Sequence, residues 1–212
     1  MRLTKLGHSC VRLEKNGGSL VIDPGVWSGP DAAASADAIL ITHEHPDHVD
    51  GARVATALTG RKDLELWASA TVAGQFAEFG GRIHTVDDGD VFQAAGFDVH
   101  VYGHDHAVIH PDVPVVVNTG FAVDGQVFHP GDSLTVPREP VPVLLIPVNA
   151  PWLKVSEMID YGRAVAPSRG YAIHDGLLNE NGLALAQRLL GMAAGSGGGT
   201  FSRLEPGTSV EI

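Results

Sequence analysis

Three histidines and an aspartate, whose side chains can bind metal ions, lie within the seven-residue segment 42–48, which reads THEHPDH. They are His43, His45, Asp47 and His48. Neutral imidazole and carboxylate groups are the usual protein ligands of zinc and similar divalent ions. In extended backbone His43 and His45 point to the same side and can reach one ion, whereas Asp47 and His48 lie further along and can reach a second. The segment therefore predicts two neighbouring metal ions.

The elements that precede these side chains predict where they lie. The apolar run 38–41 (AILI) is typical of a buried strand, so segment 42–48 leaves the carboxyl end of that strand. Further ligand candidates also follow expected strands near a glycine, and these are His104, Asp132 and His174. Since each oxygen of a carboxylate can bind a different ion, Asp132 fits between two metals. His106 has the same donor chemistry as His104 and stays a rival for its place.

Other residues near the expected site have two interpretations each. Asp23 ends a strand before a proline, where its carboxylate either caps the turn or orients a ligand histidine. His8 follows the first strand. Its side chain either reaches the substrate or supports a ligand residue, or it has a purely structural role. Trp27 and Trp152 lie in loops and either contact substrate or pack. The residues alone leave all of these open.

Composition limits the classes of protein to consider. A chain of 212 residues suits a single domain spanning 1–212. The formal net charge of -11 argues against a basic face for long nucleic acid. The single cysteine excludes an intramolecular disulfide, and no apolar stretch is long enough to span a membrane, so we expect a cytoplasmic protein with no membrane partner. The sequence does not indicate the oligomeric state.

The order of the expected elements indicates the fold class. Each half of the chain begins with short strands joined by turns and continues with strands that alternate with helices. Two sheets packed together with helices outside them would bury both sets of apolar faces. We therefore expect an α/β protein.

The motifs together carry a family resemblance. The pattern HxHxDH at 43–48, followed by His104, the GDS step at 131–133 and His174, resembles the metallo-β-lactamase superfamily. Segments 7–10 (GHSC) and 22–24 (IDP) resemble the branch that includes the ascorbate-6-phosphate lactonase-type hydrolases. The resemblance extends from about residue 8 to residue 174. It implies a four-layer αββα sandwich of two mixed sheets, with a dinuclear site on one edge.

The resemblance also implies a ligand set. It assigns His43, His45 and His104 to the first metal, and Asp47, His48 and His174 to the second, with Asp132 shared by both. Asp23 would support a ligand histidine. Zinc is expected first, with manganese and iron as alternatives, because His and Asp ligands accept all three. The chain has no cysteine near Asp132 or His174 and so departs from the antibiotic-hydrolysing enzymes that use a cysteine ligand.

The expected activity is hydrolysis of a small-molecule substrate. A hydroxide bridging two cations would attack an electrophilic carbonyl or phosphorus, and Asp47 would orient it and accept or relay its proton. A small ester or lactone, with or without a phosphate group, is the first expectation. A phosphodiesterase acting on a nucleotide or other phosphodiester is the second. A diiron redox module and a non-catalytic, metal-stabilised scaffold are the remaining alternatives.

Overall fold

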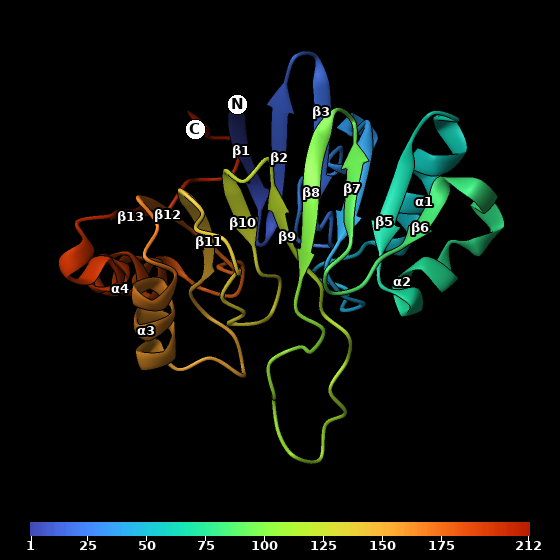
Figure 1. Cartoon of the computed structure of the whole chain (residues 1–212). Helices are drawn as coiled ribbons and strands as arrows, with labels where there is room; N and C mark the ends of the chain where they lie inside the picture. Colours follow the sequence, from blue (N-terminus) through green and yellow to red (C-terminus); the bar gives the residue numbers. More distant parts are fainter.

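Two β-sheets lie face to face, with helices on the outer face of each (Figure 1). The computed structural model describes residues 1–212 apart from the side chain of Ser196. The first sheet has the strand order β14-β1-β2-β3-β4-β5-β6, and the second has the order β13-β12-β11-β10-β9-β8-β7. In both sheets antiparallel strands at one side continue into parallel strands at the other. Both sheets are therefore mixed, as the family resemblance implies.

The strand bounds follow the chain. The first sheet contains β1 (Arg2–Gly7), β2 (Cys10–Lys15), β3 (Gly18–Ile22), β4 (Ala38–Ile41), β5 (Glu65–Ala68), β6 (Ile83–Thr85) and β14 (Ser209–Glu211). The second contains β7 (Val91–Ala94), β8 (Phe97–Tyr102), β9 (Gly120–Val123), β10 (Val127–His129), β11 (Val143–Pro147), β12 (Arg169–Ile173) and β13 (Thr200–Ser202). The α-helices are α1 (Gly51–Gly60), α2 (Ala70–Gln75), α3 (Val155–Val165) and α4 (Glu180–Leu190).

Strand β4 shows why the sheets form the middle of the molecule. Leu40 packs into the core between the two sheets, whereas Ile39 and Ile41 pack against α1 and α2 on the outside. A strand covered on both faces reads as a continuous apolar run rather than as an alternating one. On the other sheet, Leu145 faces the central core and Leu144 packs under α3 and α4. These layers confirm the predicted αββα sandwich.

The strands also set the position of the loops that follow them. Strands β3, β4 and β5 run parallel in one sheet, and β10, β11 and β12 run parallel in the other. The loops after β3, β4, β10, β11 and β12 therefore leave one edge of the sandwich. A long loop between β8 and β9, residues 103–119, projects from the same edge (Figure 1). The candidate site is built from these loops.

Two short segments lie between the main elements. Residues 115–117 contribute only an isolated bridge, between Asp105 and Val117. A short 3₁₀ helix covers Gly191–Gly197, and the side chain of Ser196 lies outside the described residues. Among the helices that the structure describes, none combines the length and apolar character needed to cross a membrane.

Candidate metal centre

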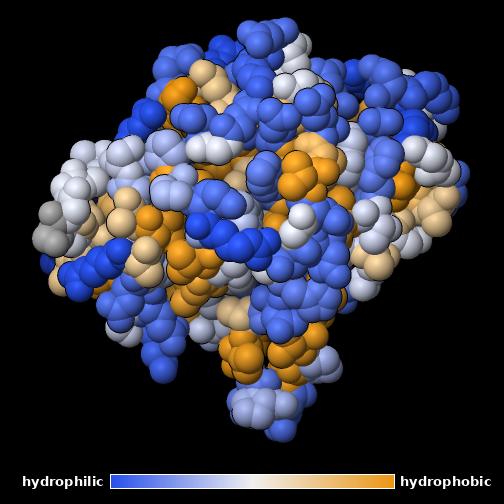
Figure 2. All heavy atoms as spheres, in the orientation of Figure 1, coloured by the Kyte–Doolittle hydropathy of each residue, from blue (hydrophilic) through white to orange (hydrophobic). Residues whose placement is uncertain are grey.

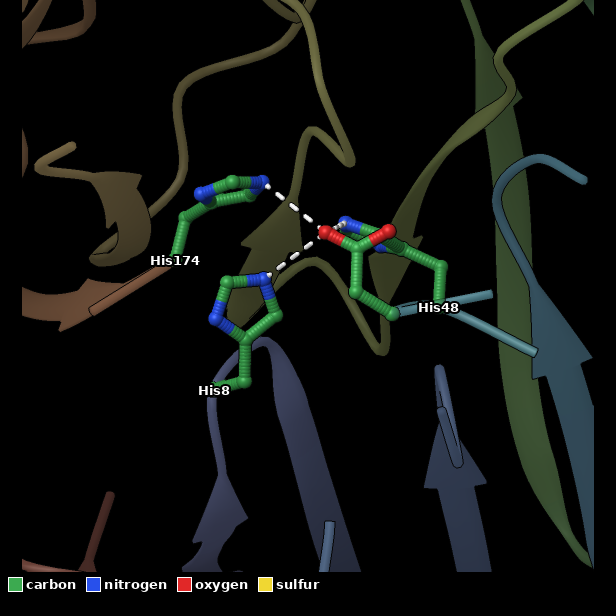
Figure 3. A group of neighbouring side chains, drawn as sticks. His8, His48 and His174 are labelled. Carbon is green, nitrogen blue, oxygen red and sulfur yellow. Dashed lines mark hydrogen bonds and ion pairs between the residues drawn. The ribbon is translucent and has the colours of Figure 1, made fainter. Parts of the chain in front are cut away.

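Two adjoining clusters of histidine and aspartate side chains lie at this edge. One contains His43, His45, His106 and Asp132, and the other contains His8, Asp47, His48 and His174. In each cluster, one ligand-capable atom from every member lies within 4.8 Å of the others. Figure 3 shows how the rings of His8, His48 and His174 lie near one another. Oδ2 of Asp47 lies 3.2 Å from Nε2 of His8, 3.9 Å from that of His48 and 3.6 Å from that of His174.

The loop after β4 is held by its own backbone and by the loop after β3. The amide of His48 donates to the carbonyl of His45 (2.9 Å), and the amide of Val26 donates to the carbonyl of Pro46 (2.9 Å). The two loops touch at Gly25, where a Cβ would lie 1.9 Å from the carbonyl oxygen of Asp47. A side chain at residue 25 would therefore displace Asp47 from the cluster.

Asp132 lies between the two clusters. Its Oδ1 is 3.1 Å from Nε2 of His48, and its Oδ2 is 3.0 Å from Nε2 of His174 and 3.4 Å from Nε2 of His106. The indole N–H of Trp152 donates to the same Oδ2 (3.0 Å). Although burial opposes ionisation, the neighbouring histidines, His48 above all, hold the pKa of Asp132 well below its usual range. The carboxylate thus faces both groups of imidazoles.

The backbone before Asp132 makes this position available. Gly131 has a φ of +64°, and a Cβ there would lie 2.2 Å from Oδ1 of Asn118. That oxygen accepts the amide N–H of Asp132 (2.9 Å). The glycine therefore lets Asn118 approach closely enough to hold the backbone of Asp132.

Asp23 supports His48 from behind. Its Oδ2 is 2.6 Å from Nδ1 of His48, and the carboxylate also accepts hydrogen bonds from the amide and the hydroxyl of Thr42, both at 2.8 Å. Asp23 is fully buried and has a positive φ of 53°. With Nδ1 of His48 engaged, its Nε2 is the nitrogen that faces the cluster. This contact corresponds to one of the two interpretations that the sequence left open for Asp23, the one that the resemblance implies.

Backbone carbonyl oxygens orient the imidazoles of His174 and His106 in a similar way. Nδ1 of His174 lies 2.5 Å from the carbonyl oxygen of Asn149, and Nδ1 of His106 lies 2.6 Å from that of Ala107. Both nitrogens are donors there, because a carbonyl can only accept. In the neutral form of each ring Nε2 therefore carries no proton and faces the cluster, and this is the form that binds a metal ion.

Four buried polar atoms in the clusters test whether metal ions fit. Nε2 of His48, His106 and His174 and Oδ1 of Asp132 have no aligned hydrogen-bond partner among the described residues. Buried polar groups are otherwise almost always paired. Burial also lowers the pKa of His43 and His45, and the neighbouring imidazoles lower both further. Neutral imidazoles and carboxylates that point at one another are the donors that divalent ions bind, so the residues fit such ions.

The expected position of His104 is wrong. Its side chain is 56% exposed, and its Nδ1 pairs with Oδ1 of Asp87 at 2.8 Å, away from both clusters. His106 is buried instead, with its ring 5.0 Å from that of His43 and 4.8 Å from that of His45. The loop continues past residue 104 and is held there by the bridge from Asp105 to Val117. His106 therefore occupies the place in the first cluster that was predicted for His104.

His8 belongs beside Asp47. The amide of Gly176 donates to its Nδ1 (3.0 Å), so the proton of the neutral ring is on Nε2. That Nε2 lies 3.2 Å from Oδ2 of Asp47 and donates to it. His8 therefore orients Asp47 through a hydrogen bond, which is one of the interpretations that the sequence left open for it. Burial raises the pKa of Asp47, but this hydrogen bond and the electrostatic interactions with His48 and His174 outweigh burial and lower that pKa to about 2.

A cavity of about 320 Å³ opens over the two clusters. His45, Asp47, His106, Asp132 and His174 line its polar part. Its remaining wall is apolar and consists of Val26, Trp27, Pro46, Ile109, Pro151, Trp152 and Leu177. No lysine or arginine is among the described residues that line it. Both tryptophans therefore lie at the mouth of the candidate site, one of the two interpretations that the sequence left open.

The comparison with protein families adds to this geometry. A family described as "Beta-lactamase superfamily domain" matches residues 2–174, which include both clusters. The chain belongs to the β-lactamase superfamily. Several proteins that resemble the chain are named metal-dependent hydrolases, and this chain is an enzyme of that kind.

Three similar proteins show the extent of the likeness. Protein Rv0786c of Mycobacterium tuberculosis is 42% identical over 184 residues, which cover 84% of this chain and 85% of that protein. The UPF0173 metal-dependent hydrolase MK1542 of Methanopyrus kandleri is 29% identical over 148 residues, which cover 63% of this chain and 62% of that protein. Igni18, a metallo hydrolase from Ignicoccus hospitalis, superposes with a TM-score of 0.75 over 99% of this chain and 97% of its own, at 19% identity. That last likeness shows the shared fold.

Proposed function

We propose that this β-lactamase superfamily protein holds two divalent metal ions and hydrolyses a small carboxylic ester or lactone. The position of Asp132 carries the proposal. One carboxylate within 3.4 Å of imidazole nitrogens from both clusters is suited to bind two ions at once. Two clusters that adjoin each other favour a dinuclear site over a single ion.

The clusters suggest how the ligands are divided. His43, His45 and His106 would hold the first ion, and Asp47, His48 and His174 the second, with Asp132 shared. His8 belongs to the second cluster by distance, but its Nε2 carries a proton and serves Asp47. Zinc is the first candidate, and manganese and iron accept the same ligands. When bound, such ions polarise the attacked group and lower the pKa of bound water from ~15.7 to about 7.

The chain's own groups prepare the remaining steps. Asp47 is ionised at neutral pH because its pKa is about 2, so its carboxylate can accept a hydrogen bond from the attacking water and relay a proton. His8 holds Oδ2 of that carboxylate, which limits its rotation. Trp152 holds Asp132 through the indole N–H, and its ring helps to keep water out of the apolar part of the cavity.

The cavity favours an ester or lactone over the alternatives. A phosphodiesterase stays the second candidate, but the described lining has no lysine or arginine to bind a phosphate oxygen. The lactone class is further supported by the resemblance of segments 7–10 and 22–24 to the ascorbate-6-phosphate lactonase branch. A metal-stabilised scaffold would have a closed ligand set, whereas these clusters open into a cavity. A diiron redox module would be recognised by iron and a visible absorption band.

Elemental analysis coupled to an activity panel tests the proposal. The purified protein should contain about two divalent ions per chain and hydrolyse an aryl ester or a sugar lactone faster than bis(p-nitrophenyl) phosphate. The variant Asp132→Ala should lose metal and activity together. Asp112→Ala is the control, because the Asp112 side chain is 90% exposed in the β8–β9 loop. Full metal content and turnover in Asp132→Ala would overturn the ligand scheme.

A further inference from the structure

We infer that the substrate carries an uncharged, apolar group, which binds between Trp27 and Trp152 beside the bond that is cleaved. This inference deepens the proposed function and rests on it, because it concerns the same cavity. It concerns the part of the substrate that does not react, and it selects uncharged aliphatic or aromatic esters and lactones over phosphorylated or carboxylated ones.

The walls of the cavity come from separate loops that meet only in the folded chain. Trp27 follows β3, Ile109 lies in the β8–β9 loop, Trp152 follows β11 and Leu177 follows β12. All four surround the histidines and aspartates of the two clusters. Convergence of large apolar side chains from four loops on one opening is typical of a ligand site.

These side chains are held in contact with solvent. Leu177 is 56% exposed, Trp27 is 45% exposed and Ile109 is 38% exposed. Figure 2 shows hydrophobic atoms gathered on the projecting β8–β9 loop, where Val108, Val113 and Val115 are exposed as well. Covering an exposed apolar side chain with a ligand removes apolar surface from water and lowers the free energy. Contiguous exposed apolar side chains therefore usually mark binding surfaces.

The two tryptophans are fixed in ways that leave an apolar surface for the ligand. The indole N–H of Trp152 is used by Asp132, so the rest of this ring offers only apolar contact. The ring of Trp27 stands edge-on to that of His8, with the centroids 4.9 Å apart. The same histidine that orients Asp47 thus lies against a wall of the substrate cavity.

The charges around the cavity disfavour an anionic substrate group at this apolar wall. An anionic group would need a cationic side chain, and the described residues that line the cavity include no lysine or arginine. The formal net charge of -11 also repels anions at long range. Metal ions would attract the reacting carbonyl, but a second, remote anionic group would meet only apolar side chains there.

A series of p-nitrophenyl esters tests the inference on the metal-loaded protein. From acetate to butyrate to hexanoate, kcat/KM should rise about threefold to fourfold for each added methylene until the cavity is filled. The monoester of adipic acid, which matches hexanoate in length but ends in a carboxylate, should be cleaved at least tenfold more slowly. Equal rates for hexanoate and the adipate monoester would overturn the inference.

Variants at the cavity wall sharpen the test. Trp27→Ala should flatten the chain-length series, and Leu177→Lys should narrow or reverse the preference for hexanoate over the adipate monoester. Val91→Lys adds the same charge at a 65% exposed valine of β7, outside the lining of this cavity, and should leave both series unchanged. A Leu177→Lys variant with the wild-type preference would show that the substrate chain does not lie against Leu177.

A binding measurement separates this inference from the proposed function. Octan-2-one and 7-oxooctanoate are non-hydrolysable, of equal length, and differ in charge. By calorimetry the ketone should bind at least tenfold more tightly than the oxo acid, with a negative heat-capacity change from apolar burial. Absence of ester turnover with this binding pattern would contradict the proposed function alone. Ester turnover with equal binding of the two probes would contradict the inference alone.

Discussion

Nε2 of His8 donates to Oδ2 of Asp47 across 3.2 Å, and the amide of Gly176 fixes the tautomer that makes this possible. The contact joins the β1–β2 turn to the loop after β4, and the Gly176 amide joins both to the loop after β12. Three distant segments thus determine the orientation of one carboxylate. His8 also has a positive φ of 44°, which a residue other than glycine adopts only when its surroundings hold it there.

Replacing His8 should therefore affect turnover more than folding. His8→Ala removes the donor to Asp47, and changes to such supporting partners typically lower activity or metal affinity by about 10–100-fold. We expect kcat to fall with little change in KM. His8→Gln carries an amide N–H in a comparable position and should recover part of the loss. Steady-state kinetics with metal analysis checks this, and equal kcat values for His8→Ala and wild type would contradict the orienting role.

His106 and His104 form a matched pair for a test of the first cluster. His106→Ala removes a buried Nε2 that faces Asp132 at 3.4 Å, so we expect loss of about one bound ion per chain and at least a hundredfold loss of activity. His104→Ala changes an exposed ring that pairs with Asp87 and should keep both metal and activity. Elemental analysis of the two variants checks the assignment. The reverse pattern would restore His104 as the ligand.

Burial of His129 predicts a pH dependence of stability. Its Nδ1 accepts the amide N–H of Gly131 (3.1 Å) and its Nε2 donates to the carbonyl of Ser9 (2.9 Å), so only the neutral ring fits, and burial lowers its pKa. Below a pH of about 6.5 the unfolded chain takes up this proton first. The free energy of unfolding should therefore fall as the pH drops from 6.5 to 5.

The variant His129→Gln isolates that contribution. Glutamine does not titrate, so the difference in stability between wild type and variant should be largest near pH 7.5, at about 1–3 kcal/mol, and should shrink toward pH 5. Urea unfolding of protein freed of metal by a chelator measures the difference. A gap that stays constant over this pH range would show that His129 does not titrate differently in the folded and unfolded states.

A buried ion pair next to His174 links β1 of the first sheet to the end of β12 in the second. Nζ of Lys5 donates to the carbonyl of Ala172 (2.8 Å) and to Oδ1 of Asp175 (3.2 Å), and Lys5 is 1% exposed. Asp175→Ala leaves this ammonium without its counter-ion and should cost about 3–5 kcal/mol of unfolding free energy. Lys5→Met should cost less, because Arg203 still pairs with Asp175. Denaturant unfolding of both variants checks the order, and a larger loss in Lys5→Met would contradict it.

Much of the fold could be predicted because its signals are local. The apolar run of β4 indicates a strand covered on both faces, and ligand-type residues directly after strands indicate an edge where loops meet. Asp23, Asp132 and His174 could be placed in this way. The resemblance added the four-layer arrangement, which periodicity alone does not give.

The choice between His104 and His106 could not be predicted, because both have the same donors and follow the same strand. Contacts from distant segments decide it, since Asp87 attracts His104 and the Asp105–Val117 bridge sets the course of the loop. Ile109 and Leu177 were not singled out from the sequence for a similar reason. They matter only because the β8–β9 loop and the loop after β12 meet above the clusters. The relative positions of these two loops depend on how the folded chain packs, which sequence periodicity does not show.

The candidate metal ligands come from both sheets, so dividing the chain between the sheets would separate them. His43, His45, Asp47 and His48 follow a strand of the first sheet, whereas His106, Asp132 and His174 follow strands of the second. A break in the chain between β6 and β7 would leave each fragment with an incomplete set. Catalytic competence would then return only through fragment complementation, which makes the recovered turnover a direct assay of reassembly.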